Sequence, residues 1–100
     1  MVDTAIGPVV ADGATGFTLY TFDRDQPGRP ACVGPCLLDW PPFSAPEGAA
    51  ASGDWSVVTR EDTIVQWAFR GRPLYFHAQD QQRGDTKGQG ADNAWQAARP

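Results

Sequence analysis

The sequence predicts an all-β fold, mainly antiparallel, in a single small domain with an internal pseudo-two-fold repeat. Apolar side chains alternate with polar ones at the two-residue period of a half-buried strand, as at Val65, Trp67 and Phe69. When the chain is compared with itself at an offset of 55 residues, its only two tyrosines, Tyr20 and Tyr75, fall into register. Self-similarity at a fixed offset is the mark of a duplicated unit.

Further identities support the repeat, and no gap is needed to align them. They are Gly16 with Gly71, Leu19 with Leu74, Asp25 with Asp80, Gln26 with Gln81, and Trp40 with Trp95. We therefore expect one domain over residues 1–100, with repeats at 6–41 and 61–96. Residues 42–54 are rich in Pro, Ala, Gly and Ser, which is typical of a connecting loop.

We expect about six strands and one short helical turn. In the first repeat, 6–11 should pair with 17–23, and a helical turn at 35–40 should end at the following prolines. In the second repeat, 55–59, 63–69 and 73–78 should form successive hairpins, because polar or Gly-containing turns separate them. The expected core residues are Phe22, Trp40, Trp55, Trp67, Leu74 and Trp95.

The charge argues against a nucleic-acid partner, and the hydropathy argues against a transmembrane helix. A net charge of −4 with scattered Lys and Arg argues against nucleic acid, which requires clustered positive charge. No apolar run approaches the roughly 18 residues of a transmembrane helix. The N-terminus has neither the basic nor the long apolar region of a signal peptide, so any export signal or lipid anchor would lie on a removed N-terminal segment.

A Tyr-x-x-x-x-Asp motif occurs once in each repeat, at the end of an aromatic strand. The candidate ligand-binding residues around the two copies are Tyr20, Phe22, Asp25, Tyr75, His77 and Asp80. In a structural interpretation, each Tyr hydroxyl is buried and hydrogen-bonded, and each Asp accepts backbone amides of the turn that follows. The alternative is a paired ligand or acid–base site. No nucleophile, metal-ligand set or glycine cradle accompanies the pairs, which favours the structural interpretation.

Cys32 and Cys36 are the only cysteines and occur in one repeat only. Three residues separate them, whereas thioredoxin-type motifs have two, and a zinc site would need two further ligands. We expect a local disulfide, which indicates an oxidising compartment. Alternatively, two reduced thiols could bind Cu(I) together with His77, which occupies the position that Phe22 has in the first copy.

Four segments together resemble a known family. They are GFTLYTFDRD, CVGPCLLDWPP, TREDTIVQWAFRGRPLYFHAQD and GDTKGQGADNAW. Together they resemble the bacterial predicted lipoproteins with a Yx(FWY)xxD motif, a family of secreted tandem repeats of unknown function. The resemblance covers residues 7–96 and implies two repeats per domain and a secreted, periplasmic or cell-envelope location. His77 departs from the pattern, which has an aromatic residue there.

These observations predict a non-catalytic secreted or cell-envelope binding module, whose partner is an envelope protein or a small ligand. Its four Trp, two Tyr and five Phe exceed what so small a core needs, so an exposed aromatic cluster should form the binding face. We expect no enzymatic activity and no cofactor or metal, because a single His cannot complete a catalytic triad here. The alternative is an envelope redox or copper-handling protein that uses Cys32, Cys36 and His77.

Overall fold

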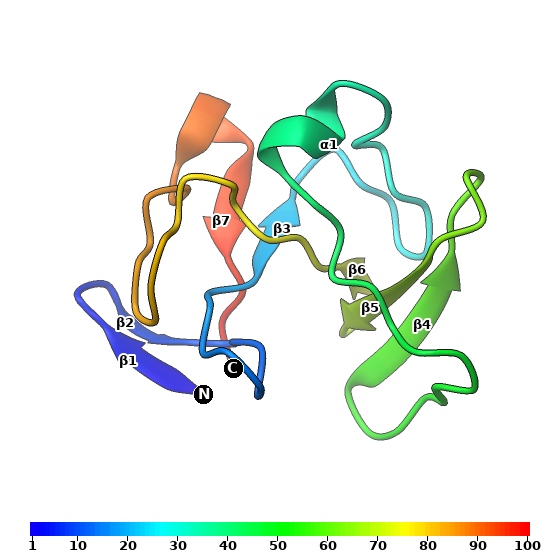
Figure 1. Cartoon of the computed structure of the whole chain (residues 1–100), viewed down its shortest axis with the longest axis horizontal. Helices are drawn as coiled ribbons and strands as arrows, with labels where there is room; N and C mark the ends of the chain where they lie inside the picture. Colours follow the sequence, from blue (N-terminus) through cyan, green and yellow to red (C-terminus); the bar gives the residue numbers. More distant parts are fainter.

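The computed structural model describes all 100 residues and consists of short antiparallel strands joined by long loops (Figure 1). In chain order the elements are β1 (Val2–Thr4), β2 (Gly7–Val9), β3 (Tyr20–Phe22), α1 (Cys36–Asp39), β4 (Trp55–Thr59), β5 (Val65–Phe69), β6 (Arg72–Pro73), the 3₁₀ turn η1 (Ala91–Asn93) and β7 (Trp95–Ala97). The strands form three sheets, β1-β2, β3-β7 and β4-β5-β6. The all-β prediction is confirmed, and α1 is the predicted helical turn at the cysteines.

The β4-β5-β6 sheet contains the two predicted hairpins, but the strand expected over 73–78 is wrong in extent, because β6 has only the two residues Arg72–Pro73. β4 has the predicted bounds, and it pairs with β5 in a register that places Val57 opposite Trp67. The turn between β5 and β6 consists of Arg70 and Gly71, whose φ angles are 52° and 82°. Positive φ at both central residues is the requirement of a type I′ turn, whose twist matches that of the flanking strands.

The expected pairing of 6–11 with 17–23 is wrong for most of its length: β2 pairs with β1 and β3 with β7, and Ala11 and Thr18 form the bridge that remains. Two strands and one bridged segment were not expected from the sequence. β1 and β7 have only three residues each, which is too short for an alternation to show. Residues 42–45 fall within the expected connecting loop, but Pro42 bridges Tyr75 and Ser44 bridges Gln66. Their partners lie in the other repeat, so no local pattern could indicate the pairing.

Tyr20, in β3, pairs through its backbone with Tyr75, which lies just after β6. The amide of Tyr20 donates to the carbonyl of Tyr75 at 2.8 Å, and the amide of Tyr75 donates to the carbonyl of Tyr20 at 2.9 Å. Tyr20 also pairs with Ala97, and Tyr75 with Pro42. Pro42 and Ala97 are themselves 55 positions apart. Each repeat therefore supplies a strand to the other about an approximate two-fold axis.

Four aromatic rings form a continuous stack across the same axis, which we call the ring stack. Trp40 and Trp95 lie at its centre, with ring centroids 3.8 Å apart and planes 1° from parallel. Phe22 stacks on Trp95 at 4.2 Å, and His77 lies on Trp40 at the same centroid distance. The order of the stack is thus symmetric, with Phe22 and His77 at its two equivalent ends.

Both tyrosine rings pack edge-on against the tryptophans and are fully buried. Tyr20 meets Trp40 at a centroid distance of 5.4 Å, and Tyr75 meets Trp95 at 5.1 Å, the edge-to-face geometry that aromatic pairs favour. Gly88 closes over the stack, because a Cβ at that position would lie 2.6 Å from Cη2 of Trp40. The two tyrosines, the two tryptophans and Phe22 thus belong to one hydrophobic cluster, the first of two, and lie around the axis.

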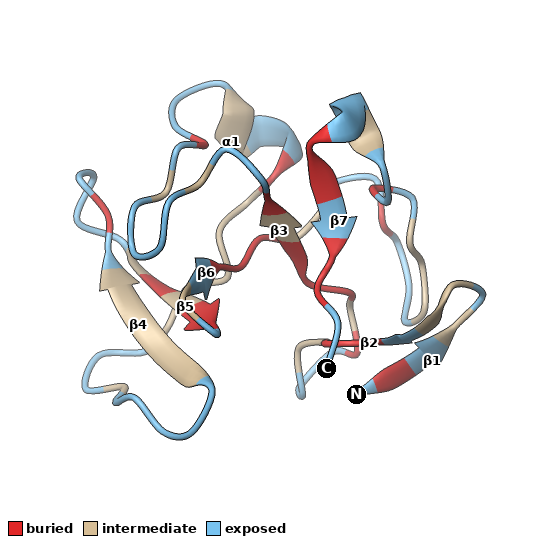
Figure 2. Ribbon diagram, turned by 180° about the vertical axis from the view of Figure 1, so that it is seen from behind, coloured by how far each residue is buried: buried red, intermediate tan, exposed pale blue.

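The second hydrophobic cluster consists of Val10, Leu19, Phe69, Leu74 and Ala98. Here the predicted core was partly wrong. Trp40, Trp95, Phe22 and Leu74 are buried as expected, but Trp55 and Trp67 are only half-buried. Figure 2 shows β4 at intermediate burial along most of its length. Along β5 the fully buried side chains are instead Gln66 and Ala68, on the opposite face of the strand, together with Phe69 at its end. Gln66 can be buried because both its amide oxygen and its amide nitrogen are hydrogen-bonded inside the protein.

Candidate functional site

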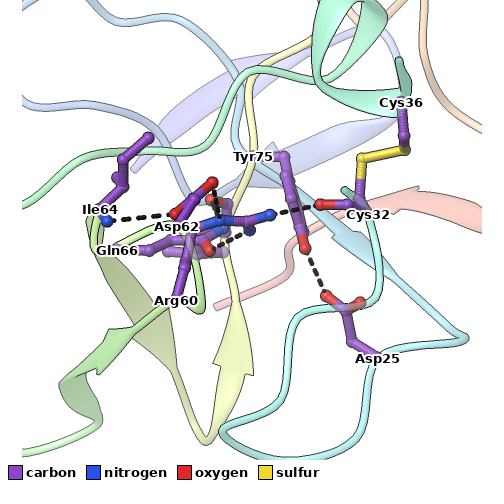
Figure 3. A network of polar contacts seen from close by, with 9 residues as sticks. Asp25, Cys32, Cys36, Arg60, Asp62, Ile64, Gln66 and Tyr75 are labelled. Atoms are coloured by element: carbon purple, nitrogen blue, oxygen red, sulfur yellow. Dashed lines mark hydrogen bonds and ion pairs between the residues drawn. A yellow bond between two sulfur atoms is a disulfide. The ribbon is translucent and has the colours of Figure 1, made fainter. Parts of the chain in front are cut away.

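The two Tyr-x-x-x-x-Asp motifs are joined crosswise, so that each Tyr pairs with the Asp of the other repeat. The hydroxyl of Tyr20 donates a hydrogen bond of 2.7 Å to Oδ2 of Asp80. The hydroxyl of Tyr75 donates one of 2.9 Å to Oδ2 of Asp25, as Figure 3 shows. The structure thus gathers all four motif residues at the axis, in pairs that the sequence alone did not reveal.

The second oxygen of each carboxylate holds the loop that follows it. Oδ1 of Asp25 accepts the amide of Ala31 at 2.6 Å, and Oδ1 of Asp80 accepts the amide of Lys87 at 3.0 Å. The turn-capping bonds of the structural interpretation are therefore present. Because each Asp binds both a distant hydroxyl and a local amide, it links the two repeats and fixes its own loop at once.

Burial governs the protonation of this site. It raises the pKa of Tyr20 and Tyr75 well above the usual phenol value, and the neighbouring carboxylates act in the same direction. Burial also raises the pKa of Asp25 above its ordinary value of 3.8, while hydrogen bonds from Ala31 and Tyr75 oppose the change. The phenols are therefore protonated at neutral pH and act as hydrogen-bond donors.

A buried arginine extends the Tyr75 side of the site (Figure 3). Arg60, only 4% exposed, donates through Nη1 to Oε1 of Gln66 at 2.8 Å and through Nη2 to the carbonyl of Cys32. Its Nε lies 3.3 Å from Oδ2 of Asp62. Gln66 in turn donates to the carbonyl of Leu74 at 2.7 Å. The network connects the cysteine loop to the strand that carries Tyr75.

Sequence reasoning missed both Arg60 and Gln66. Arg60 occurs in a polar loop between two strands, where a solvated side chain is the usual outcome, and Gln66 alternates with apolar residues as an outward-facing residue would. Burial of both side chains is favourable because they bond to each other and to the backbone carbonyls of Cys32 and Leu74, and a pattern of residue types does not reveal these bonds.

The predicted disulfide between Cys32 and Cys36 is confirmed, with a Cα–Cα distance of 5.4 Å. Neither sulfur is then a thiolate, so the copper-handling alternative stays a prediction that first requires reduction of this bond. His77 lies at one end of the ring stack, and its buried Nδ1 has no hydrogen-bond partner. The structure brings no three His, Cys, Asp or Glu side chains together in a geometry that could hold a metal ion.

One surface cavity, of about 610 Å³, lies beside the Arg60 network. It is formed by the loop that contains Cys32 and by the end of β4, and its lining residues are Gly28, Arg29, Pro30, Val33, Gly34, Thr59, Arg60, Glu61 and Asp62. None of the Tyr, Asp, Phe or His residues of the two motifs lines it. The cavity therefore adjoins the site through Arg60 and not through the motif residues themselves.

The domain consists of two β repeats, and the Tyr of each repeat is paired with the Asp of the other. The chain belongs to the family described as a secreted repeat of unknown function, whose model matches residues 1–44 and again residues 56–99. The two matches are offset by 55 residues and each contains one motif, which confirms the repeat and the resemblance seen in the sequence. Neither a curated protein nor a solved structure matches the chain. Its helical elements are too short to cross a membrane.

The crossed pairing predicts which residues are energetically coupled. In a double-mutant cycle of Tyr20→Phe and Asp80→Ala, measured by urea unfolding, we expect a coupling free energy of about 1 to 3 kcal/mol, as for groups in direct contact. The matched control cycle combines Tyr20→Phe with Asp25→Ala, which lies in the same repeat and does not contact Tyr20, and it should give a coupling near zero. A larger coupling in the control cycle would contradict the crossed pairing.

The raised pKa of Asp25 predicts an unusual pH dependence of stability. Because the folded-state pKa lies above the unfolded value, the contribution of Asp25 is full below pH 3.8 and is lost as the pH rises through the folded-state pKa. We expect Asp25→Asn to remove this component from the free energy of unfolding, measured by urea titration across that window. Carbon-13 NMR of the Asp25 carboxyl provides the direct check, and a pKa below 3.8 would refute the assignment.

Proposed function

We propose that this protein is a non-catalytic binding module of the secreted or cell-envelope compartment. Its contact surface is a group of half-buried aromatic side chains, which we call the aromatic rim and which consists of Phe43, Trp55, Trp67 and Phe76. All four pack against the second hydrophobic cluster, and this shared position is the observation that carries the proposal. Its partner is an envelope protein or a small ligand with an apolar surface.

The geometry of the aromatic rim is that of a preformed contact surface. Phe43 and Phe76 meet edge-to-face at 5.3 Å, and Trp55 and Trp67 at 6.0 Å, so the rings hold one another in place. Large aromatic side chains that are already ordered lose little conformational entropy on binding, and they dominate the energy of many interfaces. The rim therefore offers binding area at low entropic cost.

The state of the paired motifs supports a non-catalytic role. Both oxygens of Asp25 and both oxygens of Asp80 accept hydrogen bonds from within the protein. The phenols of Tyr20 and Tyr75 are fully buried, so a substrate would have to displace an existing partner to reach them. A catalytic acid or base needs an accessible proton acceptor, which these pairs do not offer.

The family and the disulfide support the location. The family consists of secreted repeats, and the Cys32–Cys36 disulfide is the form that an oxidising compartment maintains. Attachment to the cell envelope is part of the proposal.

The test is co-sedimentation of the purified protein with isolated bacterial envelope fractions. Trp55→Ser combined with Trp67→Ser should weaken binding by about 10- to 100-fold, because aromatic residues at the centre of an interface typically contribute about 2 kcal/mol or more. The matched control is Leu38→Ser, which changes an apolar side chain that is 78% exposed and lies outside the aromatic rim.

Binding that survives the double rim variant but is lost in Asp25→Asn would refute the proposal and would identify the motif as the ligand site. The fold of each variant is verified by its near-ultraviolet circular dichroism before binding is compared. If both the rim variant and Asp25→Asn bind as the wild type does, the contact surface lies elsewhere and the rim is structural.

A further inference from the structure

We propose that the ring stack and the two Tyr–Asp pairs form a one-electron relay. In it, a hole enters the stacked rings and is trapped as a tyrosyl radical whose proton passes to the paired carboxylate. This activity goes beyond the binding role, because it uses the centre of the molecule and not the aromatic rim. It also assigns the redox role to aromatic residues instead of to Cys32, Cys36 and their thiols.

The overlap of the two indoles stabilises the radical cation that forms when an electron is first removed from the ring stack. Trp40 and Trp95 are parallel within 1° at a centroid distance of 3.8 Å, so their π systems overlap face to face. A radical cation shared by two overlapping indoles is lower in energy than one confined to a single ring. Phe22 and His77 extend the stack at 4.2 Å on either side, and Phe22 shields Trp95 because it is itself only 8% exposed.

His77 gives the stack its only half-exposed end. An oxidant that docks there is one ring from the indole pair, whereas the opposite end is closed by buried Phe22. The pseudo-symmetric position holds a hydrocarbon ring, so His77 is the feature that distinguishes an accessible end from a sealed one. This gives the departure from the aromatic motif a physical consequence.

Each Tyr–Asp pair supplies the proton acceptor that tyrosine oxidation needs. A phenol radical cation is a very strong acid, so oxidation of a buried Tyr is favourable only if a base removes the hydroxyl proton at the same time. Oδ2 of Asp80 lies 2.7 Å from the hydroxyl oxygen of Tyr20, and Oδ2 of Asp25 lies 2.9 Å from that of Tyr75. The rings of both tyrosines contact the indoles, at 5.4 Å and 5.1 Å.

The steps balance in electrons and protons. A one-electron metal-centred oxidant accepts one electron from the indole pair, which becomes a radical cation. The radical cation accepts one electron from Tyr20, whose O–H bond breaks as the proton passes to Oδ2 of Asp80, and a neutral tyrosyl radical and a neutral carboxylic acid result. A donor of the ascorbate or quinol class returns one electron, and the carboxylic acid returns the proton to the phenol oxygen. Tyr75 and Asp25 can carry out the same steps.

The experiment uses photogenerated tris(bipyridine)ruthenium(III) as the oxidant, with a cobalt(III) ammine complex as the sacrificial electron acceptor. Transient absorption distinguishes tryptophan radicals from tyrosyl radicals. Since Tyr20 and Tyr75 are the only two tyrosines, any intramolecular tyrosyl signal comes from the relay. In the wild-type protein we expect the tryptophan signal to decay into a tyrosyl signal at a rate that is independent of protein and buffer concentration and slower in heavy water.

Two sets of variants test the mechanism. Asp80→Asn combined with Asp25→Asn should slow tyrosyl formation by about 10²-fold, the lower end of what a positioned proton acceptor contributes. Tyr20→Phe combined with Tyr75→Phe keeps both rings and, where its near-ultraviolet circular dichroism matches the wild type, should leave the hole on tryptophan. The matched control, Trp55→Phe with Trp67→Phe, removes the indoles outside the stack and should leave the tyrosyl yield unchanged.

The proposal is overturned if the wild-type protein forms no tyrosyl radical, or if the rim control abolishes the tyrosyl signal. It is also overturned if tyrosyl formation accelerates with buffer base, because the proton then leaves to solvent and not to the carboxylates. If the Asn variants fail to fold, the buffer and heavy-water dependence of the wild-type protein decides the question on its own. Because the aromatic rim is intact in the Tyr and Asp variants, failure of the relay leaves the binding proposal untouched.

Discussion

The crossed exchange of hydrogen bonds at the axis is the interaction on which the rest of the structure depends. Tyr20 and Tyr75 bond to each other through their backbones and to the opposite repeat through their hydroxyls. Neither repeat can satisfy its own buried phenol, and an unpaired buried hydroxyl typically costs about 1 to 3 kcal/mol. The strands, the loops held by the Asp residues and the ring stack are all placed relative to this exchange, so the two repeats form one cooperative unit.

The approximate two-fold symmetry of the two repeats fails at positions where their side chains differ in polarity or charge. Phe22 and His77 occupy equivalent ends of the ring stack, but only His77 brings a polar atom into it. Beside Tyr20 the neighbouring donor is the amide of Gly88, whereas the Tyr75 side has the charged guanidinium of Arg60. The duplicated residues therefore account for the fold, and the unique ones are where individual properties of this protein should be sought.

The sequence revealed the repeat and the alternating strands, but not the hydrogen bonds between the Tyr of one repeat and the Asp of the other. The offset that aligned Tyr20 with Tyr75 predicted equivalent strands and turn-capping Asp residues, because these are properties of each copy. It could not assign each Tyr to the Asp of the other copy, since an equivalence between positions carries no information about contacts between them. Trp67 was misplaced for a related reason, because burial of the Gln66 face depends on hydrogen bonds with the side chain of Arg60 and the carbonyl of Leu74, which the alternation does not reveal.

Native-state hydrogen exchange of the Tyr20 and Tyr75 amides tests the central claim most directly. Each of these amides is protected by a carbonyl of the other repeat, so we expect both to exchange only through global unfolding, with opening free energies equal to each other and to the value from urea denaturation. Opening of one repeat at a lower free energy, while the amides of the other stay protected, would show that the repeats are independent and would contradict the account.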